Sequence, residues 1–133
     1  VRWPGKVPAG GASDAFLSSL EIVPTLCAAT GVEPPKGVAL DGFDMLPVLQ
    51  RKMKSSRNEM FWQRKFDKGA RVGHWKWVES SRGGGLFNLR DDIGERRDLS
   101  KEKPEVLKDV QAHFASWKKQ MQAAEPRGPF RDF

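Results

Sequence analysis

Few residues in this chain are of the types that carry out chemistry. His74 and His113 are its two histidines, and a pair about 40 residues apart does not have the spacing of a metal site. His113 lies beside the apolar stripe of a predicted helix, which predicts a surface or boundary position. His74 lies in a predicted strand next to Trp75, where a histidine serves either as a structural residue or as a substrate contact.

The acidic residues and the thiol favour structural roles. Asp91, Asp92 and Glu95 lack EF-hand spacing, and the segment from Asp92 to Glu95 is typical of a turn whose carboxylates accept local backbone hydrogen bonds. The single cysteine, Cys27, excludes a disulfide framework and a multi-cysteine metal site within the chain. Its apolar neighbours predict a buried free thiol. The chain has no Gly-x-Ser-x-Gly motif, and its glycine run at 83–85 lacks the lysine and helix of a phosphate loop.

Aromatic and basic residues alternate in the middle of the chain, which leaves two interpretations open. Either they form a stacking platform for single-stranded nucleic acid or sugars, or at least two of the three tryptophans pack under a covering helix. The residues concerned are Trp62, Trp75 and Trp77 with Arg64, Arg71 and Lys76.

Composition indicates a globular protein. The chain has 133 residues, 38% hydrophobic and 30% charged, with a net charge of +6. The positive charge fits either an anionic partner or an ordinary solvated surface. No apolar run is long enough to predict a membrane span. The first residue is Val1 rather than a methionine, so we expect a truncated chain, whose lack of a signal peptide says nothing about its parent.

The elements divide into two regions, and we expect the boundary between residues 50 and 59. Residues 1–50 predict an extended segment with turns, a helix over about 20–30, and a connector. Ser18 or Ser19 can cap this helix and Gly31 can end it. Ile22, Leu26 and Ala29 are expected to form its buried stripe.

Residues 59–133 predict an antiparallel sheet covered by a helix. Strands are expected at about 59–66, 70–79 and 86–89, with turns at 67–69 and 82–85 and a bulge at Gly73. Pro104 suits the first position of a helix over about 104–123. Apolar residues recur along it at helical spacing: Leu107, Val110, Phe114, Trp117 and Met121. The predicted class is α+β.

Five segments in this order resemble the sulfatase family, the arylsulfatases and the sulfatases of sulfated glycans. They are VRWPGKVPAG at 1–10, SSLEIVPTL at 18–26, LDGFDMLPVL at 40–49, ARVGHWKWV at 70–78, and LFNLRDDIGERRDL at 86–99 followed by PEV at 104–106. Glu21 stands where the family usually has aspartate. The resemblance covers nearly the whole chain and is to the C-terminal third of such proteins.

The resemblance implies an alkaline-phosphatase-like fold, of which this chain is the C-terminal lobe: a small antiparallel sheet packed by a long C-terminal helix, preceded by a strand-helix piece of the main α/β domain. Sulfatases hydrolyse sulfate esters with a formylglycine, made from Cys or Ser in a Cys/Ser-x-Pro-x-Arg motif, and a calcium ion. Cys27 is followed by Ala-Ala-Thr and does not match this motif. We therefore expect no catalytic and no metal-binding residue in this chain, and calcium and formylglycine in the full-length parent.

The resemblance also implies partners and contacts. The C-terminal subdomain of sulfatases rims the substrate pocket, so Trp62, Arg64 and His74 are candidate substrate contacts. Arg71 and Lys76 belong to a pattern common to family members, which favours a structural role. The expected partners are the remainder of the catalytic domain and a sulfated small molecule or glycan, with no nucleic acid and no membrane. The parent is expected to be exported to the periplasm, the exterior or a lysosome.

Two alternatives remain open at this stage. One is a basic, aromatic-bearing module that binds an anionic glycan or nucleic acid. The other is a purely structural lobe, which predicts an exposed apolar patch where Trp3, Phe16 and the first helix meet an absent domain.

Overall fold

The computed structural model describes residues 1–34, 36–37 and 40–124. The chain forms two compact units, Val1–Arg57 and Asn58–Phe133. The expected division into 1–50 and 59–133 stays a prediction for the domain organisation of the parent protein.

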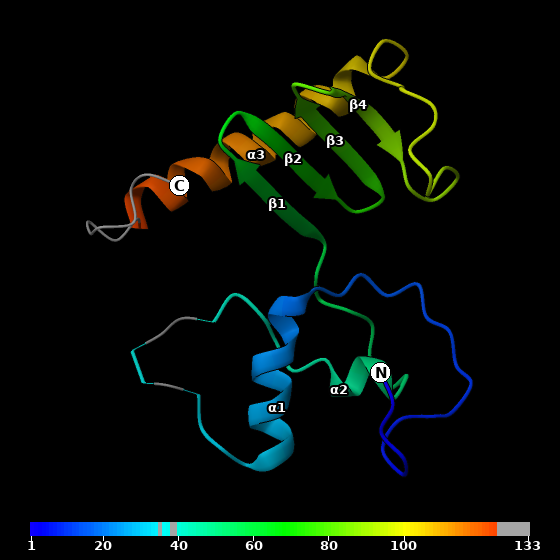
Figure 1. Ribbon diagram of the computed structural model, residues 1–133, viewed down its shortest axis with the longest axis vertical. Helices are drawn as coiled ribbons and strands as arrows, with labels where there is room; N and C mark the ends of the chain where they lie inside the picture. The colour runs from blue at the N-terminus through cyan, green and yellow to red at the C-terminus, as the bar shows by residue number, and fades with distance from the viewer. Residues whose placement is uncertain (35, 38–39, 125–133) are drawn as a thin grey trace. The chain divides into compact units, whose positions relative to one another are not determined.

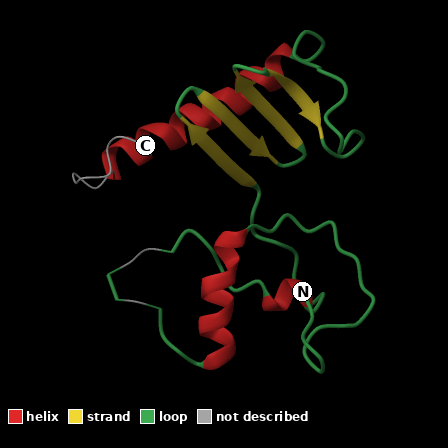
Figure 2. Ribbon diagram, in the orientation of Figure 1, coloured by secondary structure: helices red, strands yellow, loops and turns green. Residues whose placement is uncertain are grey.

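The second unit is a four-stranded antiparallel sheet with a helix across one face (Figures 1 and 2). The strands follow one another in the order of the chain. They are β1 Glu59–Arg64, β2 Asp67–Val72, β3 Trp75–Ser80 and β4 Gly83–Asn88, and the helix is α3 Pro104–Ala124. This arrangement confirms the predicted α+β class.

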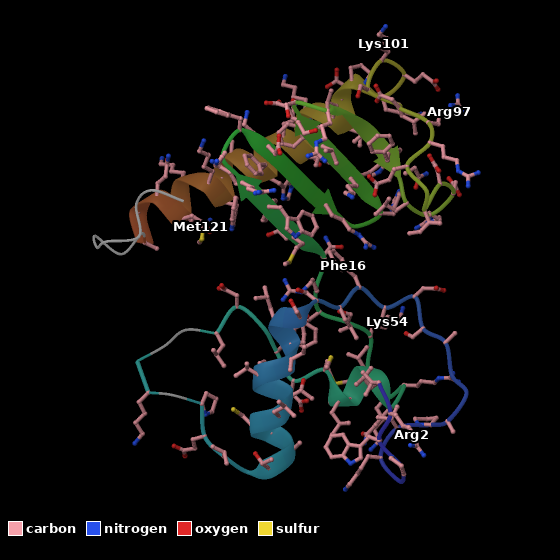
Figure 3. All side chains as sticks on the ribbon, viewed as in Figure 1. Arg2, Phe16, Lys54, Arg97, Lys101 and Met121 are labelled. Carbon is pink, nitrogen blue, oxygen red and sulfur yellow. The ribbon has the colours of Figure 1, made fainter. Side chains whose placement is uncertain are left out.

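The core of this unit lies between α3 and one face of the sheet. Phe61, Ala70, Trp77 and Leu86 oppose one another across the four strands and therefore point to the same face. Val110 and Phe114 of α3 pack against this row and are buried. Of the apolar stripe predicted for the helix, only Met121 is exposed, to 41%. Met121 lies on the part of α3 that extends past the sheet (Figure 3).

The expected positions of the strands and turns were partly wrong. The segment 70–79 is not one strand with a bulge, because Gly73 has φ +58° and forms a turn between β2 and β3. The first turn lies at Lys65, with φ +54°, and Phe66, and not at 67–69. The sheet therefore has one more strand than predicted.

A glycine run expected to form a turn is instead part of β4. A Cβ atom on Gly85 would come within 2.6 Å of the Asp98 carboxyl group. The missing side chain lets Asp98 approach the strand, and its Oδ1 accepts the backbone N–H of Leu86 at 2.9 Å. Close packing against Asp98 thus accounts for the glycine at position 85.

The described residues of the first unit form two helices joined by irregular segments. A single 3-10 turn at Ser19–Glu21 leads into α1 Ile22–Thr30, and α2 spans Leu46–Leu49. Ser18 caps this start in a reciprocal capping box with Glu21, and Gly31 ends α1 with φ +72°. Residues 1–18, all of them described, contain turns but no strand.

A buried ion pair joins distant segments of the first unit. Glu21 is fully buried, and its Oε1 accepts the Nε–H of Arg57 at 2.8 Å. Arg57 also donates to the backbone oxygen of Asp41 at 3.0 Å. The Thr25 hydroxyl, in turn, accepts the backbone N–H of Met45 at 2.8 Å, next to α2.

The apolar residues of α1 do not form the buried stripe that was expected. Ile22 is 47% exposed and Leu26 is 57% exposed. Val23, between them in sequence, is also exposed, whereas the polar Glu21 and Thr25 are buried. Within the described residues of this unit, Val48 is the one hydrophobic residue that is buried.

Candidate functional site

Two of the three predicted contacts lie together on the sheet face opposite α3. Side chains alternate along a strand, so Trp62 and Arg64 of β1 point away from the face that carries Phe61. Trp62 is 44% exposed. Its partner across the ladder is Gly69, and a Cβ atom there would lie 3.6 Å from Trp62 Cε3. One edge of the indole ring of Trp62 thus lies over Gly69, which has no side chain.

Trp62 and Arg64 help to line an open hollow of about 590 Å³. Its lining also includes the basic residues Lys68 and Lys76 and the acidic Asp67. Lys68 pairs with Glu79 at 2.5 Å, and Lys76 pairs with Glu95 at 2.6 Å. Within the part of the chain that the structure describes, the Arg64 side chain has no hydrogen-bond or ion-pair partner.

His74 lies at the opposite end of the strands. It forms the β2–β3 turn with Gly73. The backbone of Arg64, by contrast, lies opposite Asp67 at the start of β2. Six residues of strand separate Asp67 from Gly73, or roughly 20 Å at about 3.3 Å per residue. The His74 ring lies against Trp75, with centroids 5.1 Å apart. The structure therefore brings Trp62 and Arg64 together but not His74.

The remaining tryptophans of the sheet pack under the helix. Trp77 is part of the core, and Trp75 packs against the core residues. The Trp77 and Phe114 rings meet edge-to-face at a centroid distance of 5.4 Å. The prediction that at least two of the three sheet tryptophans pack under a helix is confirmed, which leaves Trp62 as the exposed one.

Arg71 and Lys76 are neighbours in the register on the same face as Trp62. The Nε–H of Arg71 donates to the Gly73 carbonyl at 2.9 Å, and partial burial lowers the pKa of its guanidinium. Lys76 anchors the loop that carries Glu95. Both contacts lie within the lobe itself, and the structural role of these two residues stays a prediction.

The acidic segment after β4 forms a turn, as predicted. Asp92 Oδ2 accepts the backbone N–H groups of Arg96 at 2.7 Å and Arg97 at 2.9 Å. Figure 3 labels Arg97 and Lys101 on this loop between β4 and α3. His113 is exposed and lies 2.9 Å from Glu59, and Cys27 is half-buried rather than buried.

Two further findings concern the described residues only. No three His, Cys, Asp or Glu side chains among them come together to hold a metal ion. No helix among them has the length and apolar character needed to cross a bilayer.

The sequence analysis did not predict Gly69 and Lys68 as parts of the hollow, because it placed them in a turn. Only the strand pairing shows that Gly69 faces Trp62.

Comparison with known proteins gives a consistent set of relatives, although no protein-family model matches the chain. Rat arylsulfatase G is 31% identical over 126 residues, which cover 77% of this chain and 24% of the relative. Pig N-acetylgalactosamine-6-sulfatase is 30% identical over 83 residues, 59% of this chain and 16% of the relative. Human arylsulfatase A is 43% identical over 60 residues, 45% of this chain and 11% of the relative. The chain thus spans a quarter or less of the length of these relatives.

Solved structures are similar in fold. Ps i-CgsB in complex with k-i-k-neocarrahexaose has a TM-score of 0.72 and 29% identity, over 86% of this chain and 27% of that one. A structure described under the metabolism of multiple glycosaminoglycans by Bacteroides thetaiotaomicron has a TM-score of 0.72 and 25% identity. It covers 89% of this chain, which in turn covers 28% of that one.

Proposed function

Since the chain corresponds to the C-terminal portion of a sulfatase, we propose that it is the lobe of a sulfuric ester hydrolase that rims the substrate pocket. The substrates proposed for the parent are sulfated carbohydrates. Similarity to sulfatases over more than three quarters of the chain supports this proposal. The half-exposed Trp62 beside Arg64 at an open hollow is the observation that carries the rim role.

The proposed contacts form two groups. Trp62 and Arg64 form one contact surface, and His74, at the other end of the strands, forms a second. A rim that touches a carbohydrate at two places needs a substrate of more than one sugar ring. The proposal therefore favours an oligosaccharide over a small aryl sulfate as the substrate of the parent.

The chemical step is proposed to lie in the remainder of the parent protein. Formylglycine and calcium would be held there, and no described residue of this chain is assigned to either. When bound, calcium supplies positive charge at the sulfate group during ester cleavage. The residues of this chain would bind and orient the substrate.

Turnover assays test the proposed function. We expect the parent protein to hydrolyse a sulfated oligosaccharide and the 133-residue chain alone to be inactive on aryl sulfates. Calcium-dependent turnover by the purified chain would show that the chemistry lies here and would overturn the division of roles. A parent protein without sulfatase activity on any sulfate ester would overturn the function itself.

The proposed partner of the first unit is the remainder of the catalytic domain. The exposed apolar side chains of α1 support this proposal, since isolated domains seldom leave such a row in water. Replacing Leu26 with serine is expected to leave the stability of this chain within about 0.5 kcal/mol. The same substitution in the parent should lower the melting temperature by several degrees. An unchanged parent would exclude this face as the contact.

A binding module for an anionic glycan or nucleic acid is the second candidate, favoured by Arg64, which has no partner within the described part of the chain, beside the exposed indole. The requirement for the rest of the parent distinguishes a binding module from the lobe of a hydrolase. A binding module holds its ligand without the rest of the parent and needs no ester bond in it. Binding to unsulfated single-stranded DNA, weakened by salt and by Trp62→Ala, would favour the nucleic-acid version.

A further inference from the structure

We propose that the hollow beside Trp62 holds one sulfated sugar ring of an oligosaccharide, with the ring stacked on the indole and its sulfate on Arg64. This inference names the ligand chemistry of the proposed rim and rests on the proposed function for the source of that ligand. It requires an aromatic face open to solvent, a cation free to bind an oxyanion, and space for a ring.

The aromatic face is present at Trp62. The side chain is 44% exposed, whereas Trp75 and Trp77 of β3 pack with the core on the other face of the sheet. Gly69 lies opposite it, and Val78 is the next residue across the sheet. Neither residue adds a polar group beside the indole, so this part of the hollow suits the C–H face of a sugar ring, as Trp suits flat apolar partners.

The cation is supplied by Arg64, whose side chain has no hydrogen-bond or ion-pair partner among the described residues. Lys68 and Lys76 form ion pairs with carboxylates at 2.5 and 2.6 Å, and the Asp67 carboxylate accepts the backbone N–H of Ser81 at 3.2 Å. Arg64 is therefore the basic residue of the hollow that is available to an anion. A guanidinium binds two oxygens of a tetrahedral oxyanion at once, which fixes the direction of the ester as well as its charge.

Spacing and volume fit the same ligand. Trp62 and Arg64 are two residues apart on one strand and so point to the same side, about 7 Å from each other. A sulfate ester on a ring stacked over Trp62 can reach a long, flexible arginine at this distance. The hollow of about 590 Å³ lies within the range of small-ligand sites.

Calorimetric titration of the 133-residue chain tests the proposal. The probes are sulfated neocarrahexaose and the same hexasaccharide after chemical desulfation, because its galactan backbone carries no other charge. We expect Trp62→Ala to weaken binding of the sulfated probe about tenfold and Trp62→Phe to weaken it less. We expect Arg64→Ala to weaken binding of the sulfated probe about tenfold and to leave the desulfated probe unaffected.

Two control variants distinguish binding at this site from non-specific binding to exposed aromatic rings and cations. Phe66→Ala removes an aromatic ring that is 89% exposed and lies outside the hollow. Lys101→Ala removes an exposed cation from the loop between β4 and α3 (Figure 3). Neither should change the affinity by more than twofold. Equal losses for Lys101→Ala and Arg64→Ala would overturn the proposal, as would equal affinity for the two hexasaccharides or tighter binding of single-stranded DNA.

Assays on the parent distinguish this inference from the proposed function. If the parent hydrolyses the sulfated hexasaccharide and Trp62→Ala leaves its KM unchanged, the inference fails and the function stands. If the chain binds as expected while the parent cleaves no sulfate ester, the function fails and the binding site stands. A raised KM with an unchanged kcat supports both.

Discussion

The two units of this chain bury opposite kinds of residue. The sheet-and-helix unit buries aromatic and aliphatic side chains between α3 and the strands. The helical unit buries a carboxylate and a hydroxyl, Glu21 and Thr25, and leaves the apolar side of α1 in solvent. Burial of apolar surface is the main driving force of folding. The sheet-and-helix unit therefore has an apolar core of its own, whereas the described residues of the helical unit bury little apolar surface.

Cutting the chain between Arg57 and Asn58 tests this difference between the two units. We expect residues 58–133 to melt cooperatively by circular dichroism, because their core lies within that unit. We expect residues 1–57 to show no cooperative transition, since Val48 is the one buried hydrophobic residue among those that the structure describes there, and burial of apolar surface is the main driving force of folding. A sharp transition in 1–57 would contradict the contrast.

The next largest effect is expected from Phe114→Ala. Phe114 is buried and contacts three rings, those of Phe61, Trp77 and Trp117. Removing it should reduce the free energy of unfolding of the sheet-and-helix unit by about 3–5 kcal/mol in urea denaturation. Phe66→Ala at the exposed hairpin tip is the matched control, and we expect a change within about 0.5 kcal/mol. Similar losses for the two variants would contradict the core as described.

In the helical unit, Arg57→Ala should act through charge rather than packing. It leaves the carboxylate of Glu21 buried without its cation, and breaking such a pair costs about 3 kcal/mol. We expect faster hydrogen exchange of the amides of α1 and an unchanged melt of the sheet-and-helix unit. The double variant Arg57→Ala with Glu21→Ala should recover part of the lost protection, because no charge is then left buried. No recovery would mean that the pair acts by its shape alone.

The smallest effect concerns pH and Asp98. Hydrogen bonds from the Ser100 hydroxyl and from the backbone N–H groups of Leu86 and Ser100 hold the pKa of Asp98 below its ordinary value of 3.8. A folded-state pKa below the unfolded one stabilises the fold at pH values above the unfolded pKa. This stabilisation is lost as the pH falls through the folded pKa. Urea midpoints between about pH 6 and about pH 3 should therefore fall less in Asp98→Asn than in the original chain. Parallel pH curves would contradict this role of Asp98.

Local patterns were sufficient to predict much of the architecture. The helical spacing from Leu107 to Trp117 and the proline at its start predict α3, because a helix places residues three and four apart on one side. Ser18 and Gly31 predict the ends of the first helical segment, since capping depends on neighbours in the chain. The sulfatase resemblance, too, was visible from five segments in order.

The strand pairing was decided only by the tertiary structure. Asp67, Lys68 and Gly69 have the composition of a turn, yet all three pair with β1, because Lys65 and Gly73 adopt positive φ and place the turns elsewhere. The last two of them also pair with β3. A shift in the position of a turn changes which residues face each other. Gly69 opposite Trp62, and hence the hollow, could not be predicted without the correct pairing.

The sequence by itself thus determined the two longer helices, α1 and α3, the class of the sheet-and-helix unit and the family it resembles, because these depend on residue types at short spacing. The tertiary structure decided which face each side chain takes. It separated His74 from Trp62 and Arg64 by the length of a strand, and it left the apolar residues of α1 exposed. The physical reason is that burial depends on what packs against a face, and an apolar periodicity does not specify which surface will cover it.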